Sequence, residues 1–286
     1  MISRRNLLIA PSVLLIMNAP RRRTRARAQP ASTKLDLLSA PLELTGEWAG
    51  SPQGAAALVI GRMREVCLTG VRLLSDQQPK RVRIDHHSSG PPAIWLHDKP
   101  AQTAWIIVDI GARAWCQLAY QFGHELGHVF CNSWGPEAKP APPCQWLEEA
   151  MAEAFSIRAL ALLADSWERE PPFPGDAPYA SSIRRYRQDL IENYKKSAPP
   201  GPDIATCYRS HCRDFTQGKG DPMVLAVLAE LEKDKACVED MGAVNRWPQR
   251  SALPLEEYLS SWLTSCAEIG APGQLPSRLR RVLELA

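Results

Sequence analysis

The clearest periodic pattern in the chain lies at residues 112–131, where hydrophobic side chains recur at the spacing of an α-helix. With successive residues about 100° apart, the hydrophobic positions fall on one stripe: Trp115, Leu118, Ala119, Phe122, Leu126, Val129 and Phe130. His124 and His128 project from the opposite side, which also carries Gln117. Gln121 shares that polar side. We predict a helix that buries its hydrophobic stripe and leaves both histidines on the other face.

A second helix is predicted over residues 145–167, after a loop at 132–143 that is rich in proline and glycine. Its hydrophobic stripe is formed by Leu147, Ala150, Met151, Ala154, Ala161 and Leu162. Glu149 and Glu153, four residues apart, share the opposite face. Because a loop of this length can return the chain antiparallel, we expect the two helices to pack side by side.

Shorter β-branched runs before residue 111 predict strands. The expected strands lie at about 42–48, 71–75, 81–86, 93–97 and 103–110. The other expected helices lie at about 52–67, 179–196, 222–238, 254–268 and 276–285. This order predicts an α+β fold, in which the strands come before the two central helices and a helical region follows them.

The N-terminus resembles a twin-arginine export signal. Residues 3–8 (SRRNLL) lead into a hydrophobic run at 7–19, and residues 26–28 (ARA) fit a small-x-small cleavage site. The run contains a proline and an asparagine, and it is shorter than the ~20 residues of a membrane-spanning helix. We therefore predict that residues 1–28 are an export signal peptide and that the mature protein has no stable membrane span. Such a protein would be exported to the bacterial periplasm or secreted.

Removal of this signal changes the charge of the chain. The whole sequence has 34 basic and 31 acidic residues, a net charge of +3. Residues 1–28 contain seven of the basic residues, all arginines, and no acidic residue, which leaves 27 basic residues and a net charge of −4. The mature protein is therefore slightly acidic, and we expect no nucleic-acid partner.

All eight cysteines lie in the mature part, at positions 67, 116, 131, 144, 207, 212, 237 and 266. An even number of cysteines in an exported chain suggests disulfide bonds. The pair that we expect is Cys131 with Cys144, which would close the loop between the two central helices. Free buried thiols are the alternative. The sequence contains no C-x-x-C, so a cysteine-rich zinc site is not expected.

The candidate chemistry begins at residues 124–128, His-Glu-Leu-Gly-His, which have the pattern H-E-x-x-H. On a helix this spacing puts two imidazoles one turn apart, where both can bind one zinc ion. Structural histidines, the alternative, would be expected among the hydrophobic residues instead. Glu125 is too close in sequence to His124 to curl back onto the same metal. It is therefore free to act as a general base on metal-bound water.

A catalytic zinc needs a third protein ligand and an open position for water. The second central helix can supply that ligand, because Glu149 lies on its polar face and the loop turns this helix back toward the first. Glu153, one turn further on, is placed to hold the other ring nitrogen of a histidine and fix its tautomer. Glu148 is the alternative ligand. A solvated helix surface is the other interpretation of Glu149 and Glu153.

Taken together, the two segments resemble those of the gluzincin metallopeptidases. In the aminopeptidase branch the second segment reads W-L-x-E-G-x-A, and its glutamate is the third zinc ligand. Here residues 146–152 read WLEEAMA, and the matching glutamate is Glu149. An acidic residue four positions on, as in the thermolysin-like branch, matches Glu153. The chain departs from the family's pattern at Ala150 (usually glycine), at Glu148 (usually asparagine) and at Glu153 itself (more commonly aspartate).

This resemblance, which covers about residues 103–165, implies a zincin-like fold. A small mixed β-sheet lobe packed on the zinc-binding helix would occupy residues 29–170, and an α-helical lobe would occupy 171–286. The family also implies one zinc ion per chain and a peptide or protein substrate, with strand 103–110 pairing with the extended peptide. The aminopeptidase segment G-x-M-E-N is absent from the sequence, so we expect an endopeptidase of the cell envelope. The family's oxyanion donor, a Tyr or His beyond the third ligand, would be one of Tyr179, Tyr186, Tyr208 and His211.

Two other functions stay open from the sequence. One is a zinc hydrolase that uses the same ligands on a bond other than a peptide bond. The other is a zinc-containing envelope protein that binds or assembles with a partner. The intact Glu125 favours an enzyme, because a non-catalytic zinc site does not need that carboxylate. We expect His86, His87 and His97, in the strand region, to be structural.

Overall fold

The computed structural model describes residues 36–48, 52–87, 90–111, 113–197, 203–216 and 221–285, without the side chains of 211–216. The expected export signal, residues 1–28, lies outside this part of the chain, and so do the side chains of His211 and Cys212. Leu35–Ala286 forms one compact unit. The division into two lobes at residue 170 stays a prediction.

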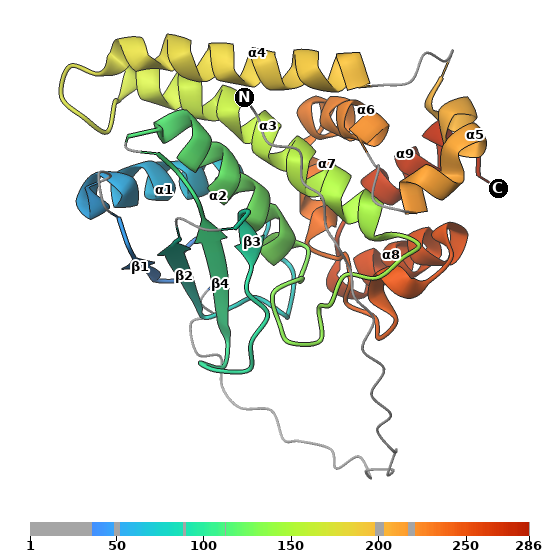
Figure 1. Ribbon diagram of the computed structural model, residues 1–286. Helices are drawn as coiled ribbons and strands as arrows, with labels where there is room; N and C mark the ends of the chain where they lie inside the picture. The colour runs from blue at the N-terminus through green and yellow to red at the C-terminus, as the bar shows by residue number, and fades with distance from the viewer. Residues whose placement is uncertain are drawn as a thin grey trace. The chain divides into compact units, whose positions relative to one another are not determined.

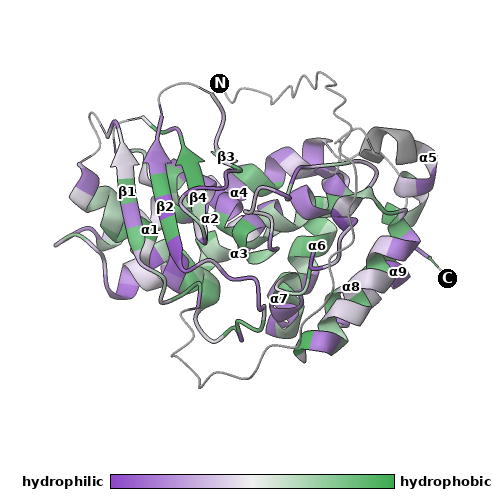
Figure 2. Cartoon of the chain, turned by 90° about the horizontal axis from the view of Figure 1, so that it is seen from below, coloured by the Kyte–Doolittle hydropathy of each residue, from purple (hydrophilic) through white to green (hydrophobic). Residues whose placement is uncertain are grey.

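The β-branched runs form a four-stranded sheet in the order β1-β2-β4-β3. The strands are β1 (Leu42–Gly46), β2 (Arg81–His86), β3 (Ala93–Ile94) and β4 (Thr103–Val108). The first, second and fourth strands are parallel, with Leu42 beside Val82 and Val82 beside Ala104, whereas β3 is antiparallel to β4. The sheet is therefore mixed, and β4 is its most continuously hydrophobic strand (Figure 2).

Two expectations about this sheet are wrong. Residues 71–75 form no strand, because Val71 is buried in the core while Arg72 pairs with Glu239 from a distant helix. The other is that β4 would pair with a peptide, whereas it is an inner strand with β2 on one side and β3 on the other. A strand buried on both faces reads as a continuous hydrophobic run, which is the pattern of β4. The edge strand on that side is β3.

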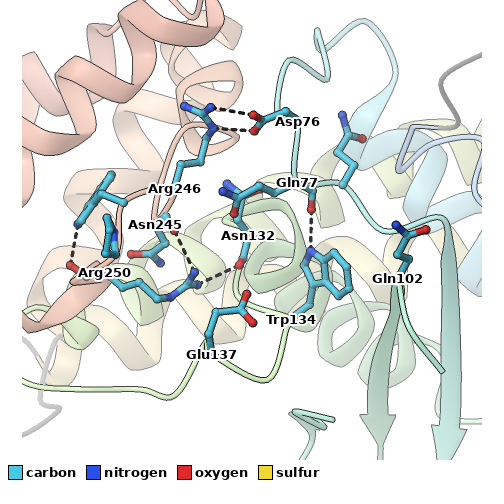
Figure 3. A pocket seen from close by; sticks show the side chains of 12 residues that line it. Asp76, Gln77, Gln102, Asn132, Trp134, Glu137, Asn245, Arg246 and Arg250 are labelled. Atoms are coloured by element: carbon cyan, nitrogen blue, oxygen red, sulfur yellow. Dashed lines mark hydrogen bonds and ion pairs between the residues drawn. The ribbon is translucent and has the colours of Figure 1, made fainter. Parts of the chain in front are cut away.

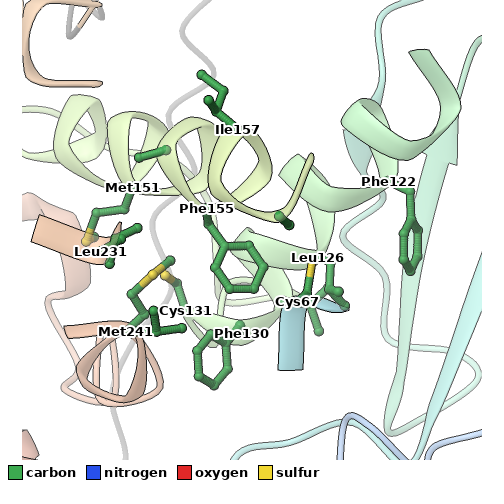
Figure 4. Packing of buried hydrophobic residues seen from close by; sticks show 14 of the residues in the cluster. Cys67, Phe122, Leu126, Phe130, Cys131, Met151, Phe155, Ile157, Leu231 and Met241 are labelled. Carbon is green, nitrogen blue, oxygen red and sulfur yellow. The ribbon is translucent and has the colours of Figure 1, made fainter. Parts of the chain in front are cut away.

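Helices cover the sheet in successive layers (Figure 1). The four helices concerned are α1 (Gln53–Leu68), α2 (Trp115–Phe130), α3 (Gln145–Arg169) and α4 (Ala180–Ser197). Both α1 and α2 contact the sheet, α3 packs on α1 and α2, and α4 packs on α3. Large hydrophobic side chains of α2 and α3, such as Phe122, Phe130 and Phe155, fill the space between these layers (Figure 4).

The C-terminal region is helical, as predicted. Its elements are η1 (Ala177–Tyr179), α5 (Ile204–Thr216), α6 (Asp221–Lys233), α7 (Lys235–Met241), η2 (Arg250–Ala252), α8 (Leu255–Ile269) and α9 (Gln274–Val282). The single helix expected over 222–238 is split, because the Asp234 side chain accepts a hydrogen bond from Ala236 N (2.9 Å) and caps a new helix. The helix α5, which follows a proline-rich stretch, was not predicted from the sequence.

Every helix in the described residues lacks the combination of length and hydrophobicity that a membrane span requires.

The central helices α2 and α3 pack closely together at Gly127. A Cβ atom at this position would lie 3.0 Å from the Cα and 3.2 Å from the Cβ of Ala152. Contacts of this length are tighter than nine in ten real Cβ contacts, so a larger residue at position 127 would make α3 shift by a few tenths of an ångström. This spacing brings the polar face of α3 next to the histidines of α2.

We predict that Gly127→Ala lowers the free energy of unfolding by about 1–3 kcal/mol, because the added methyl group overpacks the α2–α3 contact. The matched control is Gly61→Ala on α1, where an added Cβ would have no atom within 4 Å. That change should be neutral or stabilise the protein by up to about 1 kcal/mol, through helix propensity alone. Chemical denaturation of both variants measures the difference. Equal stability of the two variants would contradict the tight contact.

Candidate metal centre

The helix α2 is fixed to the end of β4 by a side chain on its polar face. Gln121 accepts a hydrogen bond from Asp109 N (2.9 Å) and donates one to Asp109 O (2.6 Å), just after the strand ends. His86 reaches the same loop, where its Nε2 lies 3.1 Å from Ile110 O. The hydrophobic stripe of α2 is buried as predicted, and these hydrogen bonds fix the position of the helix that carries the two histidines.

Three side-chain atoms from α2 and α3 converge on one point. The Nε2 atoms of His124 and His128 are 3.1 Å apart, and Glu149 Oε2 lies 3.5 Å from each of them. A tetrahedral zinc ion with bonds of about 2.0–2.2 Å would hold its ligand atoms about 3.3–3.6 Å apart. The triangle therefore has the size of one face of such a tetrahedron, and it contains the three residues that the sequence predicted as metal ligands.

Glu125 lies beside this triangle and is almost fully buried, with 2% of its surface exposed. One of its carboxylate oxygens is within 4.8 Å of ring nitrogens of His124 and His128. Among the described residues, His124, Glu125 and His128 thus also form a group of side chains close enough together to hold a metal ion. They could hold one, and the carboxylate expected to act as a base is next to the ligand atoms.

The structure gives Glu148 a role that the sequence analysis did not assign. Its Oε1 lies 2.7 Å from Nδ1 of His128, on the side of the ring that faces away from Glu149. A carboxylate at Nδ1 holds the proton on that nitrogen and leaves the Nε2 lone pair for a metal ion. Glu148 is 1% exposed, so this hydrogen bond is shielded from water. In this arrangement it supports a ligand and does not act as one.

Glu153 lies near the other histidine. Its Oε2 is 3.4 Å from Nδ1 of His124, longer than a good hydrogen bond. The hydroxyl groups of Tyr120 and Tyr194 each donate to Glu153 over 2.6 Å and hold the carboxylate in place. The sequence analysis missed both tyrosines. Tyr120 could have been found, since it precedes His124 by one helical turn, whereas nothing in the sequence around Tyr194 links it to the site.

The electrostatics of the centre favour a cation. Burial lowers the pKa of His124, but the nearby carboxylates, with Glu153 the strongest and Glu149 next, outweigh burial and raise this pKa to about 9. For His128, Glu149 and Glu148 likewise outweigh burial, so its pKa lies well above the ordinary value. The histidines in turn hold the pKa of Glu149 well below its usual range, although partial loss of water around this half-buried side chain acts in the opposite direction. Positive charge is stabilised here, yet an Nε2–Nε2 distance of 3.1 Å has room for only one proton, so the converging lone pairs fit a metal ion.

Access to the centre comes from the side of Glu149. The side chains of His124 and His128 are 3% and 8% exposed, whereas that of Glu149 is 40% exposed. A catalytic metal needs one position that is open to water or substrate. The higher exposure of the Glu149 side chain is compatible with such a position on its side of the centre.

The expected oxyanion donors lie at several places around α2 and α3. The Tyr179 hydroxyl accepts a hydrogen bond from Cys116 Sγ (3.3 Å). The Tyr186 ring packs edge-on against Tyr120, with centroids 6.0 Å apart, and the Tyr208 ring lies 5.7 Å from that of Trp146. None of these contacts selects one residue as the donor, and His211 belongs to the side chains outside the described part.

The expected staple between Cys131 and Cys144 is not formed in the structure, where both are free, buried thiols. The pairing stays a prediction. The three other histidines lie apart from the ligands: His86 bonds to backbone atoms of Glu47 and Ile110. The two others contact Asp85 (His87) and the Trp105 ring (His97).

We predict that the purified protein binds one divalent metal ion per chain and that His128→Ala or Glu149→Ala removes it. Each change removes one of the three expected ligand atoms, and the two that remain are too few for tight binding. His87→Ala, at an exposed histidine outside the centre, is the control and should keep the metal. Elemental analysis after dialysis measures the metal content. Full metal content in the His128 and Glu149 variants would contradict the ligand set.

No protein-family model matches the chain, and neither a curated protein nor a solved structure matches it. The likeness to gluzincins therefore rests on two sequence segments and on the geometry that they adopt. That geometry joins two imidazoles and one carboxylate at the distances of a single ion, with a second carboxylate beside them.

Proposed function

We propose that this protein is a zinc-dependent peptidase that hydrolyses peptide bonds with metal-activated water. The observation that carries the proposal is the triangle formed by Nε2 of His124, Nε2 of His128 and Oε2 of Glu149, with Glu125 next to it. Two imidazoles and one carboxylate make up a ligand set typical of catalytic zinc in peptidases. When bound, zinc supplies Lewis acidity, which polarises a carbonyl group and lowers the pKa of water toward about 7.

Each residue of the centre has a distinct task in this reaction. Glu125 takes a proton from the attacking water and passes it to the leaving nitrogen as the C–N bond breaks. It can do so because it is buried, with a carboxylate oxygen within 4.8 Å of ring nitrogens of His124 and His128. Glu148 orients the ring of His128 through its Nδ1 atom, and Glu153 places a negative charge 3.4 Å from Nδ1 of His124. In this mechanism Glu125 moves the proton, while the side chains around it keep fixed positions.

The edge strand β3 offers a place for an extended peptide. Trp95 N donates to Trp105 O (2.8 Å), and Ile94 is paired with Ile106. In an antiparallel pair the backbone groups alternate in direction, so those of Ile94 point away from β4. Because β3 also contacts α2, a peptide that added to this edge would run alongside the helix that carries the histidines.

The proposed setting is the bacterial cell envelope, on the basis of the arginine pair and hydrophobic run in residues 1–28. The absence of a G-x-M-E-N segment for a free amino terminus supports an endopeptidase. A zincin-like arrangement is also proposed, on the order of elements: a small mixed sheet, the helix with both histidines, the helix with Glu149 and then further helices.

The test is cleavage of a peptide library by the zinc-loaded protein, read by mass spectrometry, beside Glu125→Gln. Removal of the general base should lower the cleavage rate about 10²–10⁴-fold. Zinc content should stay at one per chain, because Glu125 is not one of the three corners. The amide has nearly the shape of the carboxylate, so the change leaves the packing intact.

Equal cleavage by the two proteins would refute Glu125 as the base. If neither protein cleaves any peptide while both hold zinc, the peptidase proposal fails, and the centre serves another bond or a binding role. The library also defines the specificity, since each cut reports the residues on both sides of the bond.

A further inference from the structure

Glu148, the partner of His128, is itself held from a distant part of the chain. Its Oε2 accepts a 2.6 Å hydrogen bond from Nδ2 of Asn245, 97 residues further along. The same Nδ2 donates to Ser133 Oγ (3.1 Å), and the amide oxygen accepts from the Tyr258 hydroxyl (3.2 Å). Asn245 is 2% exposed. Its whole amide is therefore engaged in a buried network that ends on the metal centre.

The backbone of this network is unusual at three places. Asn132, Asn245 and Arg250 have φ angles of 62°, 59° and 47°, in the left-handed region that side chains rarely adopt. Arg250 donates to the carbonyl oxygens of Asn245 and Asn132, each over 2.9 Å. The Asn132 amide donates to Gly242 O (3.0 Å) and Val244 O (2.7 Å). Strained residues persist where surrounding bonds hold them, and they gather at functional sites.

A cavity of about 400 Å³ lies beside the network (Figure 3). Asn132, Asn245 and Arg250 line it, but their side chains are hydrogen-bonded to other atoms of the protein. The amide of Asn245 is thus committed to Glu148 and Ser133 and not to a ligand in the cavity. The cavity gives water a route to this region if that amide is removed.

We propose that Asn245 is a positioning residue of the metal centre, an inference that rests on the proposed function. Its Nδ2 fixes the plane of the Glu148 carboxylate, and the other oxygen of that carboxylate fixes Nδ1 of His128. The Nε2 atom of His128 then points at the place where Glu149 and His124 converge. A segment of the C-terminal region that carries no sequence motif thereby sets the geometry of a ligand on α2.

The network explains why an asparagine suits this position. An amide can donate to a carboxylate and accept from the Tyr258 hydroxyl at the same time. Asparagine also tolerates the left-handed backbone better than most residues. Without the amide, the Glu148 carboxylate keeps only its bond to His128 and is free to turn. Loss of an outer partner of this kind typically weakens metal binding about 10–100-fold.

The test is the zinc dissociation constant of the full-length protein and of Asn245→Gly, by competition with a zinc indicator at fixed pH. Glycine accepts a positive φ without strain, so this change removes the amide alone. The matched control is Asp240→Asn, five residues earlier, whose carboxylate accepts from Gly273 N and Leu275 N outside the network. Tyr258→Phe removes only the hydroxyl that steadies the amide, and it tests the same idea if Asn245→Gly does not fold.

Asn245→Gly should bind zinc about 10–100-fold more weakly, and Tyr258→Phe should shift affinity by a smaller factor in the same direction. The Asp240 control should lower the melting temperature and leave zinc affinity unchanged. The visible spectrum of cobalt-loaded Asn245→Gly should also change, because the orientation of one ligand differs. Folded Asn245→Gly with parental zinc affinity and spectrum would overturn the inference while the proposed function stands. A parent protein that binds no zinc would overturn the proposed function itself.

Discussion

The close approach of α2 and α3 is the constraint on which the metal centre depends. Both helices bury hydrophobic stripes, and they meet at Gly127 and Ala152 with almost no side chain between their backbones. At that spacing Glu149 on one helix lies within 3.5 Å of a ring nitrogen of each histidine on the other. The catalytic geometry proposed for this protein is thus a consequence of how two helices pack, with the sheet and Gln121 fixing where α2 lies.

A cluster of buried carboxylates and imidazoles is costly to a folded protein unless each group finds partners. Here the carboxylates have partners from several segments of the chain. Tyr120 and Tyr194 hold Glu153, while Asn245 holds Glu148. The remaining imbalance is at the centre itself, where three lone pairs converge and the carboxylates favour positive charge. A divalent ion would balance these charges, which supports the proposal that the cluster holds a metal.

The sequence predicted what depends on local periodicity. The helix with both histidines and the helix with Glu149 follow from hydrophobic positions at helical spacing, and their bounds are within a few residues of those predicted. Contacts between segments that are distant in the sequence could not be predicted from this periodicity. Asn245 carries no pattern that links it to Glu148, and Tyr194 lies in a helix, predicted at 179–196, whose sequence has no motif that links it to the histidines.

Strand pairing shows the same limit. The run 103–110 was correctly predicted as a strand, but the sequence did not show that residues 93–94 would pair with it and form the edge of the sheet. Hydrophobicity on both faces of β4 was a usable sign that it is an inner strand. The unforeseen break at Asp234 is a case of a capping side chain overriding a continuous hydrophobic pattern.

X-ray absorption at the zinc edge of the metal-loaded protein identifies the atoms that bind the ion. We expect a first shell of nitrogen and oxygen atoms at about 2.0–2.2 Å, with the outer-shell signature of two imidazoles and no sulfur. A hydroxamate should add oxygen atoms to that shell by occupying the open position. A sulfur shell at about 2.3 Å, or a closed shell that a hydroxamate does not alter, would contradict a catalytic centre built from His124, His128 and Glu149.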